Sequence, residues 1–146
     1  MFDSIGTEFR YKLRSIRISQ ASAVRLKGIV FAEYVVPGEI HVFSVPELPW
    51  SLPFLLRDAD RKAFERYGAR LDVDLAREIT TVNWSLAGLR IFVLYEVLAH
   101  ELGHHLLQAH RGKRIGTVCR RSDHERRAEL QSRRVKRAYG IDFQCE

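Results

Sequence analysis

The sequence is poor in cysteine, proline and methionine, and it contains no long apolar run. Two cysteines in 146 residues are too few for a disulfide framework, so a reducing, cytoplasmic location is expected. The longest nearly apolar runs, residues 29–36 and 90–99, are well short of the ~18 residues that a membrane span needs. The N-terminal residues include two acids and no apolar h-region, so they predict no secretion signal.

The composition is that of an ordinary folded domain. Hydrophobic residues make up 46% of the chain and charged residues 29%, which excludes collagen, coiled coils and a disordered chain. The length predicts a single domain over residues 1–146, since domains usually have about 100–200 residues.

Positive charge is concentrated near the C-terminus. The chain carries +6 overall, but residues 111–137 hold eleven Lys and Arg against three acids, which is +8 for this segment alone. The segment therefore predicts either a solvated helix face or a basic surface for nucleic acid or an acidic protein.

The hydrophobic pattern predicts an α+β fold. Runs rich in β-branched residues at 29–36 and 40–45, joined by Pro37-Gly38, are typical of a hairpin, and 79–84 is a further β-rich run. Three of the four prolines place a non-helical connection at 46–53. Helices are expected at four places, namely 7–16, 57–67, 87–108 and 123–139. The helix over 87–108 has apolar residues on nearly every side, as expected for a central, buried helix.

A histidine and glutamate motif lies in this central helix. His100-Glu101-Leu102-Gly103-His104 places two imidazoles one helical turn apart on the same face. Two imidazoles in this arrangement can bind one Zn²⁺, and Glu101 lies beside them, where a carboxylate can take a proton from a metal-activated water. The surrounding residues are uncharged, which is not typical of a solvated helix.

This HELGHH helix resembles the active-site helix of the zincins, the HExxH zinc metallopeptidases. The resemblance implies that His100 and His104 are zinc ligands and that Glu101 is the general base. It also implies a zincin-like fold, with a small mixed or antiparallel sheet packed on the HExxH helix and a C-terminal glutamate helix. Zincins bind extended substrate at an edge strand, which residues 40–45 or 79–84 are expected to supply.

A catalytic zinc usually has a third protein ligand. Glu125 is favoured, because Glu125-Arg126-Arg127-Ala128-Glu129 is similar to the ExxAD motif of the thermolysin-like gluzincins. That similarity makes Glu125 the ligand and Glu129 an acceptor that orients a ligating histidine. On a helical wheel both carboxylates border the apolar arc, and the arginines lie opposite.

Other interpretations stay open at this stage. Glu125 is also the fourth position of a capping box that begins at Ser122. His110 has the spacing of the third metzincin ligand, although Leu107 replaces the required glycine, and His124 or Cys119 are further candidates. Tyr139 or His110 are candidates for stabilising an oxyanion.

The sequence thus predicts a zinc metallopeptidase, a hydrolase that takes a protein or peptide as its substrate. Among small zincins it is similar to the ImmA/IrrE type, whose members act on helix-turn-helix regulators, so the resemblance implies a regulatory protein as substrate. The alternatives are a non-catalytic zinc-binding module and a nucleic-acid-associated protein that uses the arginine-rich helix. No membrane partner is expected, and the pattern does not predict an oligomeric state.

Overall fold

The computed structural model describes residues 10–27, 29–110 and 121–138 of the chain. The fold is α+β, with two three-stranded sheets where one sheet was expected. The chain forms two compact units, the first from Met1–Ser19, Ala32–Val42 and Val97–Glu146 and the second from Gln20–Phe31 and Phe43–Glu96. In the described parts of the chain, no helix is long and apolar enough to cross a membrane.

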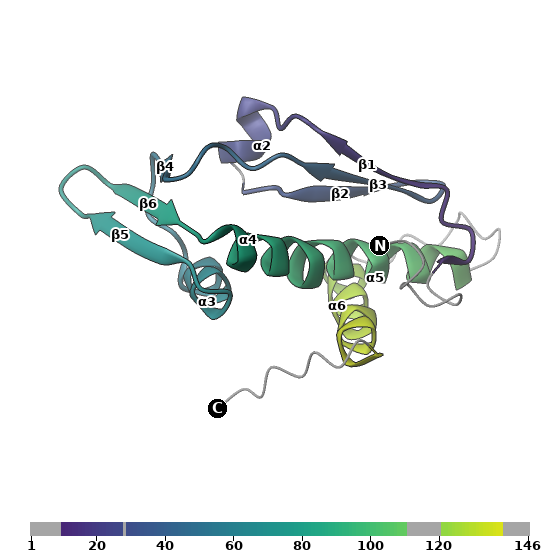
Figure 1. Cartoon of the computed structure of the whole chain (residues 1–146). Helices are drawn as coiled ribbons and strands as arrows, with labels where there is room; N and C mark the ends of the chain where they lie inside the picture. The colour runs from purple at the N-terminus through teal and green to yellow at the C-terminus, as the bar shows by residue number, and fades with distance from the viewer. Residues whose placement is uncertain (1–9, 28, 111–120, 139–146) are drawn as a thin grey trace. The chain divides into compact units, whose positions relative to one another are not determined.

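The first unit contains a sheet with the strand order β1-β3-β2, and two helices. Its elements are β1 (Ser15–Ser19), β2 (Ala32–Val35), most of β3 (Glu39–Phe43), α5 (Ala99–His110) and α6 (Arg121–Ala138). Helix α5 lies between the sheet and α6, contacting β2 on one side and α6 on the other (Figure 1). This central helix carries the HExxH motif.

The predicted hairpin is confirmed by the antiparallel pairing of β2 with β3. Gly38 closes it with a φ of 108°, a left-handed conformation that favours glycine. A side chain here would also collide with the carbonyl oxygen of Lys12, while the Gly38 carbonyl accepts a hydrogen bond from Arg14 at 2.8 Å. Gly38 therefore lets the chain leading into β1 approach the hairpin.

The second unit is organised around an aromatic core. Its elements are α2 (Ala23–Lys27), β4 (Trp50–Leu52), α3 (Asp58–Arg66), β5 (Arg70–Asp74), β6 (Ile79–Asn83) and α4 (Leu86–Phe92). The sheet order is β4-β6-β5, with both pairings antiparallel. Phe64 contacts three other rings at centroid distances of 4.7–5.9 Å, those of Phe31, Trp84 and Phe92.

The predicted long helix is confirmed, with a local widening. Helix α4, the π-helical segment η2 (Val93–Leu98) and α5 follow one another without a break from Leu86 to His110 (Figure 1). Ser85 caps its start by accepting a hydrogen bond from Gly88 N at 3.0 Å. Because α5 returns to α-helical geometry at Ala99, the one-turn spacing of His100 and His104 is kept.

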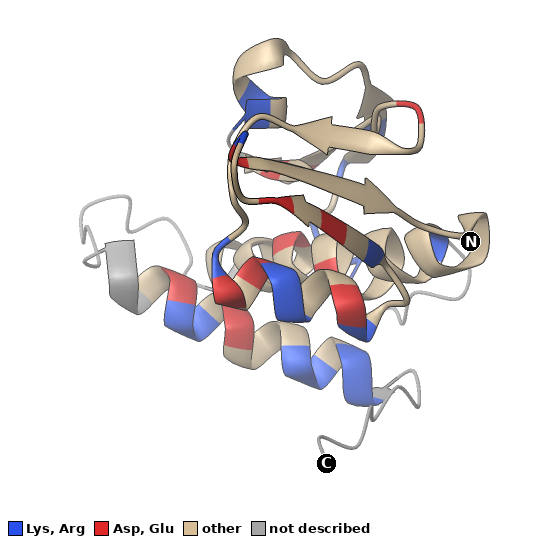
Figure 2. Ribbon diagram, turned by 90° about the vertical axis from the view of Figure 1, so that its left-hand side faces the viewer, with Lys and Arg blue, Asp and Glu red and all other residues tan. Residues whose placement is uncertain are grey.

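Helix α6 has one buried side and one charged side. Ala128, Ser132 and Val135 are buried, while the arginines of the helix are exposed where their side chains are described. Figure 2 shows Lys and Arg along this helix, which leads to the C-terminus, with acidic positions among them. This agrees with the predicted wheel, in which the arginines lie opposite the apolar arc.

Three sequence expectations about elements are wrong. Residues 11–16 are not helical, since Lys12 has a φ of 63° and Ser15 begins β1, where Ile16 and Ile18 alternate with Arg17. Two strands were missed because β4 lies among prolines and β5 is mostly exposed. Neither proposed edge strand is at an edge: β3 and β6 are each the middle strand of their sheet.

Candidate metal centre

Helix α5 turns two imidazoles toward each other. The Nε2 atoms of His100 and His104 are 3.0 Å apart, and the ring centroids are 4.7 Å apart. His104 is buried, whereas the His100 side chain is 33% exposed. The pair is therefore held at the boundary between the core and solvent.

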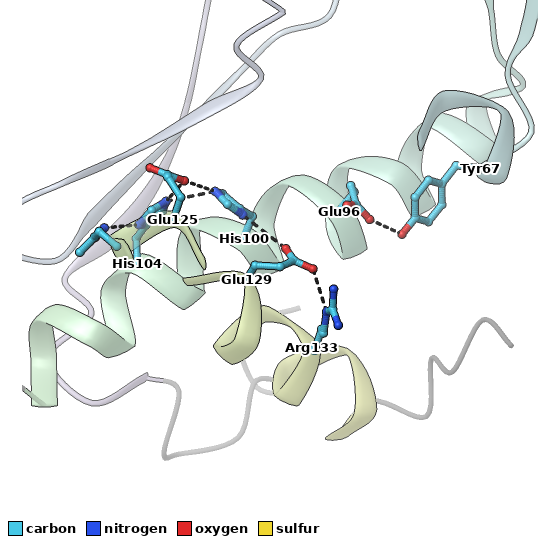
Figure 3. A network of polar contacts seen from close by, with 8 residues as sticks. Tyr67, Glu96, His100, His104, Glu125, Glu129 and Arg133 are labelled. Atoms are coloured by element: carbon cyan, nitrogen blue, oxygen red, sulfur yellow. Dashed lines mark hydrogen bonds and ion pairs between the residues drawn. The ribbon is translucent and has the colours of Figure 1, made fainter. Parts of the chain in front are cut away.

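Helix α6 brings a carboxylate to the same point. Glu125 Oε2 lies 3.4 Å from His100 Nε2 and 3.4 Å from His104 Nε2 (Figure 3). Among the described residues, His100, His104 and Glu125 are a group whose donor atoms could share one metal ion. The Glu125 side chain is 51% exposed, so the cluster is accessible to solvent from its side.

The spacing of the three donor atoms fits a tetrahedral metal. Ligands about 2.0–2.1 Å from a tetrahedral zinc lie about 3.3–3.4 Å from one another. The two distances to Glu125 match this spacing, and the 3.0 Å between the imidazoles is slightly shorter. Two nitrogens and one carboxylate oxygen are also a donor set that zinc uses in catalytic sites, with a fourth position left open.

Each imidazole has a partner on its other nitrogen, and both partners come from α6. His124 Nδ1 lies 3.1 Å from His104 Nδ1, and Glu129 Oε2 lies 3.8 Å from His100 Nδ1. Glu129 is itself held by Arg133 Nε at 3.2 Å. Partners at Nδ1 leave both Nε2 atoms available for a metal and fix the orientation of the rings.

Glu101 lies on α5 beside the cluster but not in it. It is buried, and its carboxylate accepts a hydrogen bond from the backbone N–H of Tyr34 in β2. Burial raises the pKa of Glu101, while the neighbouring His100 and the Tyr34 N–H act in the opposite direction. A carboxylate with a raised pKa is better matched to accepting a proton near neutral pH.

The hydrogen bond to Tyr34 follows from the register of the hairpin. Phe43 N donates to Phe31 O at 2.7 Å, and Ala32 pairs with Val42, so hydrogen-bonded pairs alternate with non-hydrogen-bonded pairs along β2. Tyr34 and Ile40 form a non-hydrogen-bonded pair, so the polar backbone groups of Tyr34 point to the outer edge of β2. In the described sheet β2 is an edge strand, and on its outer edge the Tyr34 N–H donates to Glu101 of the HExxH helix.

The structure also tests the other interpretations of the third position. Helix α5 continues through Leu107 to His110, so the chain does not leave the helix where a metzincin-like ligand would require it. His124 is on the far nitrogen of His104 and not at the cluster of donor atoms. Ser122 lies inside α6, which excludes the capping-box interpretation of Glu125. Cys119, Tyr139 and the side chain of His110 lie outside the described residues.

Two contacts near the site were not predicted from the sequence, although His105 was expected to be a hydrogen-bonded neighbour and not a ligand. His105 is 1% exposed, and its Nε2 contacts the carbonyl oxygen of Tyr11 at 2.9 Å, which links α5 to the chain before β1. The role of Tyr34 N–H also has no local signal, because it depends on the pairing of β2 with β3. His124 had a weak signal, since it precedes Glu125 on the same helix.

The two imidazoles of the cluster have different affinities for protons. Contact with Glu129 is the largest of the effects that raise the pKa of His100. Burial, followed by the charge of His100, lowers the pKa of His104 to about 4. In the metal-free protein, a single proton on this pair therefore resides on His100, and the side-chain contact with His100 lowers the pKa of Glu129 to about 2.

This difference predicts a pH-dependent metal affinity. A metal must displace the proton of His100, so the affinity should fall about tenfold per pH unit below the raised pKa of His100 and level off above it. His104 adds no further dependence until the pH approaches 4. Isothermal titration calorimetry with Zn²⁺ at about pH 6, below the pKa of His100, in buffers of different ionisation enthalpy should detect about one released proton per ion. An affinity unchanged between about pH 5.5 and 7.5 would contradict the assignment.

Comparison with protein-family models, with curated proteins and with solved structures finds no match to this chain. The interpretation of the cluster therefore depends on its geometry and on the residue types that form it.

Proposed function

We propose that the chain is a zinc-dependent peptidase that resembles the gluzincins, and among them the ImmA/IrrE-type metallopeptidases. The observation that carries the proposal is the convergence of His100 Nε2, His104 Nε2 and Glu125 Oε2 at 3.0–3.4 Å, the spacing of ligands around one ion. A zinc ion bound there would supply Lewis acidity and lower the pKa of a bound water toward 7.

The residues of the chain have distinct parts in this proposal. Glu101 accepts the proton of the attacking water and delivers it to the leaving amine. Its buried position and its hydrogen bond to Tyr34 N–H hold the carboxylate next to the ligands. Glu129 and His124 orient the imidazoles of His100 and His104 through their Nδ1 atoms.

The outer edge of β2 is the proposed position of the substrate. Tyr34 N–H on this edge is used by Glu101, but the outward carbonyl of Tyr34 can accept from an extended peptide, which is the usual geometry of β-strand addition. Because Glu101 contacts Tyr34 on that same edge, a peptide bound there would lie beside the proton acceptor. A protein with an exposed, extended segment is the substrate class that this arrangement favours, and the resemblance to the ImmA/IrrE type adds that this protein is a regulator.

Zinc content tests the proposal. The wild-type chain should retain about one zinc after dialysis, and Glu125→Ala should lose it, because two imidazoles alone leave the ion without its third protein ligand. Elemental analysis of proteins purified in parallel measures this, and competition with a chromophoric chelator gives the affinities. A wild-type chain that binds no zinc, even after incubation with the metal, would overturn the proposal.

Variants around the site separate ligands from their partners. His124→Ala and Glu129→Ala should weaken zinc binding by about 10–100-fold, which is the usual effect of losing a hydrogen-bond partner of a ligand. His110→Ala should leave the zinc content unchanged. A selective loss of zinc in His110→Ala, with retention in Glu125→Ala, would assign a different third ligand.

A further inference from the structure

The side of α6 that faces away from α5 carries a compact group of arginines. We define the arginine face as the exposed residues Arg126, Arg127, Leu130, Arg133, Arg134 and Arg137. Helix α6 carries seven Lys and Arg against three acids, a charge of +4. Two of the three acids, Glu125 and Glu129, lie at the metal cluster, outside this face.

Among the side chains that the structure describes, few ion pairs neutralise the arginine face. Arg133 pairs with Glu129, and Arg134 donates to the neutral side chain of Gln131 at 3.3 Å. No ion pair from Arg126, Arg127 or Arg137 is present among the described residues. Arg133 and Arg137 are one turn apart, and like charges at this spacing destabilise a helix. Repulsion between these arginines therefore destabilises the isolated helix, and a polyanion beside the helix would relieve that repulsion.

The arginines form two rows with a particular geometry. At about 100° per residue, Arg126, Arg133 and Arg137 lie within about 40° of one another, and Arg127 and Arg134 form a second row about 90° further round. Residues seven apart in each row are separated by about 10 Å along the axis. Leu130, which is 49% exposed, lies between the rows.

We infer that the arginine face binds duplex nucleic acid through its phosphates. A helix about 10–12 Å across fits a major groove about 12 Å wide, and two rows of arginines on its shoulders can reach the phosphates on both sides of the groove. The guanidinium group pairs with phosphate through two parallel hydrogen bonds. Leu130, in the middle of the face, would point toward the floor of the groove, where an uncharged side chain needs no phosphate partner. This inference does not depend on the proposed peptidase activity.

Binding to a fluorescein-labelled 20-base-pair DNA duplex tests the inference. The α6 variant replaces four arginines of the face by glutamine, namely Arg126→Gln, Arg127→Gln, Arg134→Gln and Arg137→Gln. It leaves Arg133, the partner of Glu129, in place. Its matched control carries Arg66→Gln, Arg70→Gln, Arg77→Gln and Arg90→Gln, which removes four exposed arginines from the second unit. Zinc content, measured on all three proteins, shows whether α6 remains in place.

Wild-type protein should bind with a dissociation constant of about 10⁻⁴–10⁻⁶ M that weakens steeply with salt. The α6 variant should lose about one unit of the salt slope for each phosphate contact removed, with its zinc retained, while the control changes little. The inference is overturned if the wild type does not bind at about 50 mM salt, or if the control loses as much affinity as the α6 variant. Equal binding to polyglutamate would also overturn it, because the face would then recognise charge without the duplex.

Discussion

Glu101→Gln should lower peptide hydrolysis by about 10²–10⁴-fold while the zinc content stays at the wild-type level. Glutamine has nearly the shape of glutamate but cannot accept the proton, so the variant removes the proposed proton transfer and little else. The Glu101 side chain is not one of the three converging donors, and the metal cluster should therefore persist. Cleavage of a quenched-fluorescence peptide mixture and elemental analysis of the same samples measure the two effects.

The matched comparison is Glu125→Gln, which should lose both zinc and activity. If Glu101→Gln is as active as the wild type, the residue is not the proton acceptor. If a wild-type chain with one zinc cleaves no substrate, the chain is better described as a non-catalytic zinc-binding module. These outcomes distinguish a wrong role for Glu101 from a wrong function for the whole site.

Gly103→Ala should destabilise the protein by about 1–3 kcal/mol and weaken zinc binding. A Cβ atom at Gly103 would lie within 3.0 Å of the carbonyl carbon of Ala128 and closer still to its oxygen, so the α6 backbone would have to move. Glu125 and Glu129 are in the adjacent turn of α6, and they would move with it. Chemical denaturation gives the free energy of unfolding, and chelator competition gives the zinc affinity.

Helix propensity alone predicts that Gly103→Ala raises the free energy of unfolding, since alanine is favoured over glycine in a helix by about 1 kcal/mol. The exposed position Gln108 on the same helix supplies the control: Gln108→Ala should be more stable than Gln108→Gly by about this amount. If alanine in place of glycine stabilises the protein at position 103 as it does at position 108, the close approach of α5 and α6 at Gly103 does not contribute to stability.

The sequence predicted the parts of the site that lie on a single helix. The spacing of His100 and His104 is a property of the helical repeat, and Glu125 followed from similarity to a known motif. The same motif predicted Glu129 as the partner of a ligating histidine. Which imidazole Glu129 contacts, and the position of His124 at His104, could not be assigned, because they depend on how closely α5 and α6 approach. That distance is set by Gly103 against Ala128, residues 25 positions apart, and no local pattern predicts such a contact.

The fold was predicted where a turn motif or a long helical pattern marks the element, and it was missed at short, exposed strands. The hairpin around Gly38 and the helix that carries the HExxH motif have clear patterns, and both are present. Strands β1 and β5 alternate apolar and polar residues, but over only five positions each, and both are largely exposed, so the short pattern did not identify them as strands. The edge position of β2 is a property of the whole sheet, and the order of strands is not encoded in any one of them.

A short stretch of α6 supplies three groups to the site. Glu125 is a donor of the cluster, and His124 and Glu129 are the partners of His104 and His100. The site is therefore complete only when α6 is docked on α5, and a metal ion bound there would favour the docked helix over any undocked one. By thermodynamic linkage, the free energy that docking contributes to metal binding equals the free energy that the metal contributes to docking. Metal loading and the attachment of the C-terminal helix would then be one equilibrium, so the supply of the metal would regulate the folded state of α6 as well as the occupancy of the site.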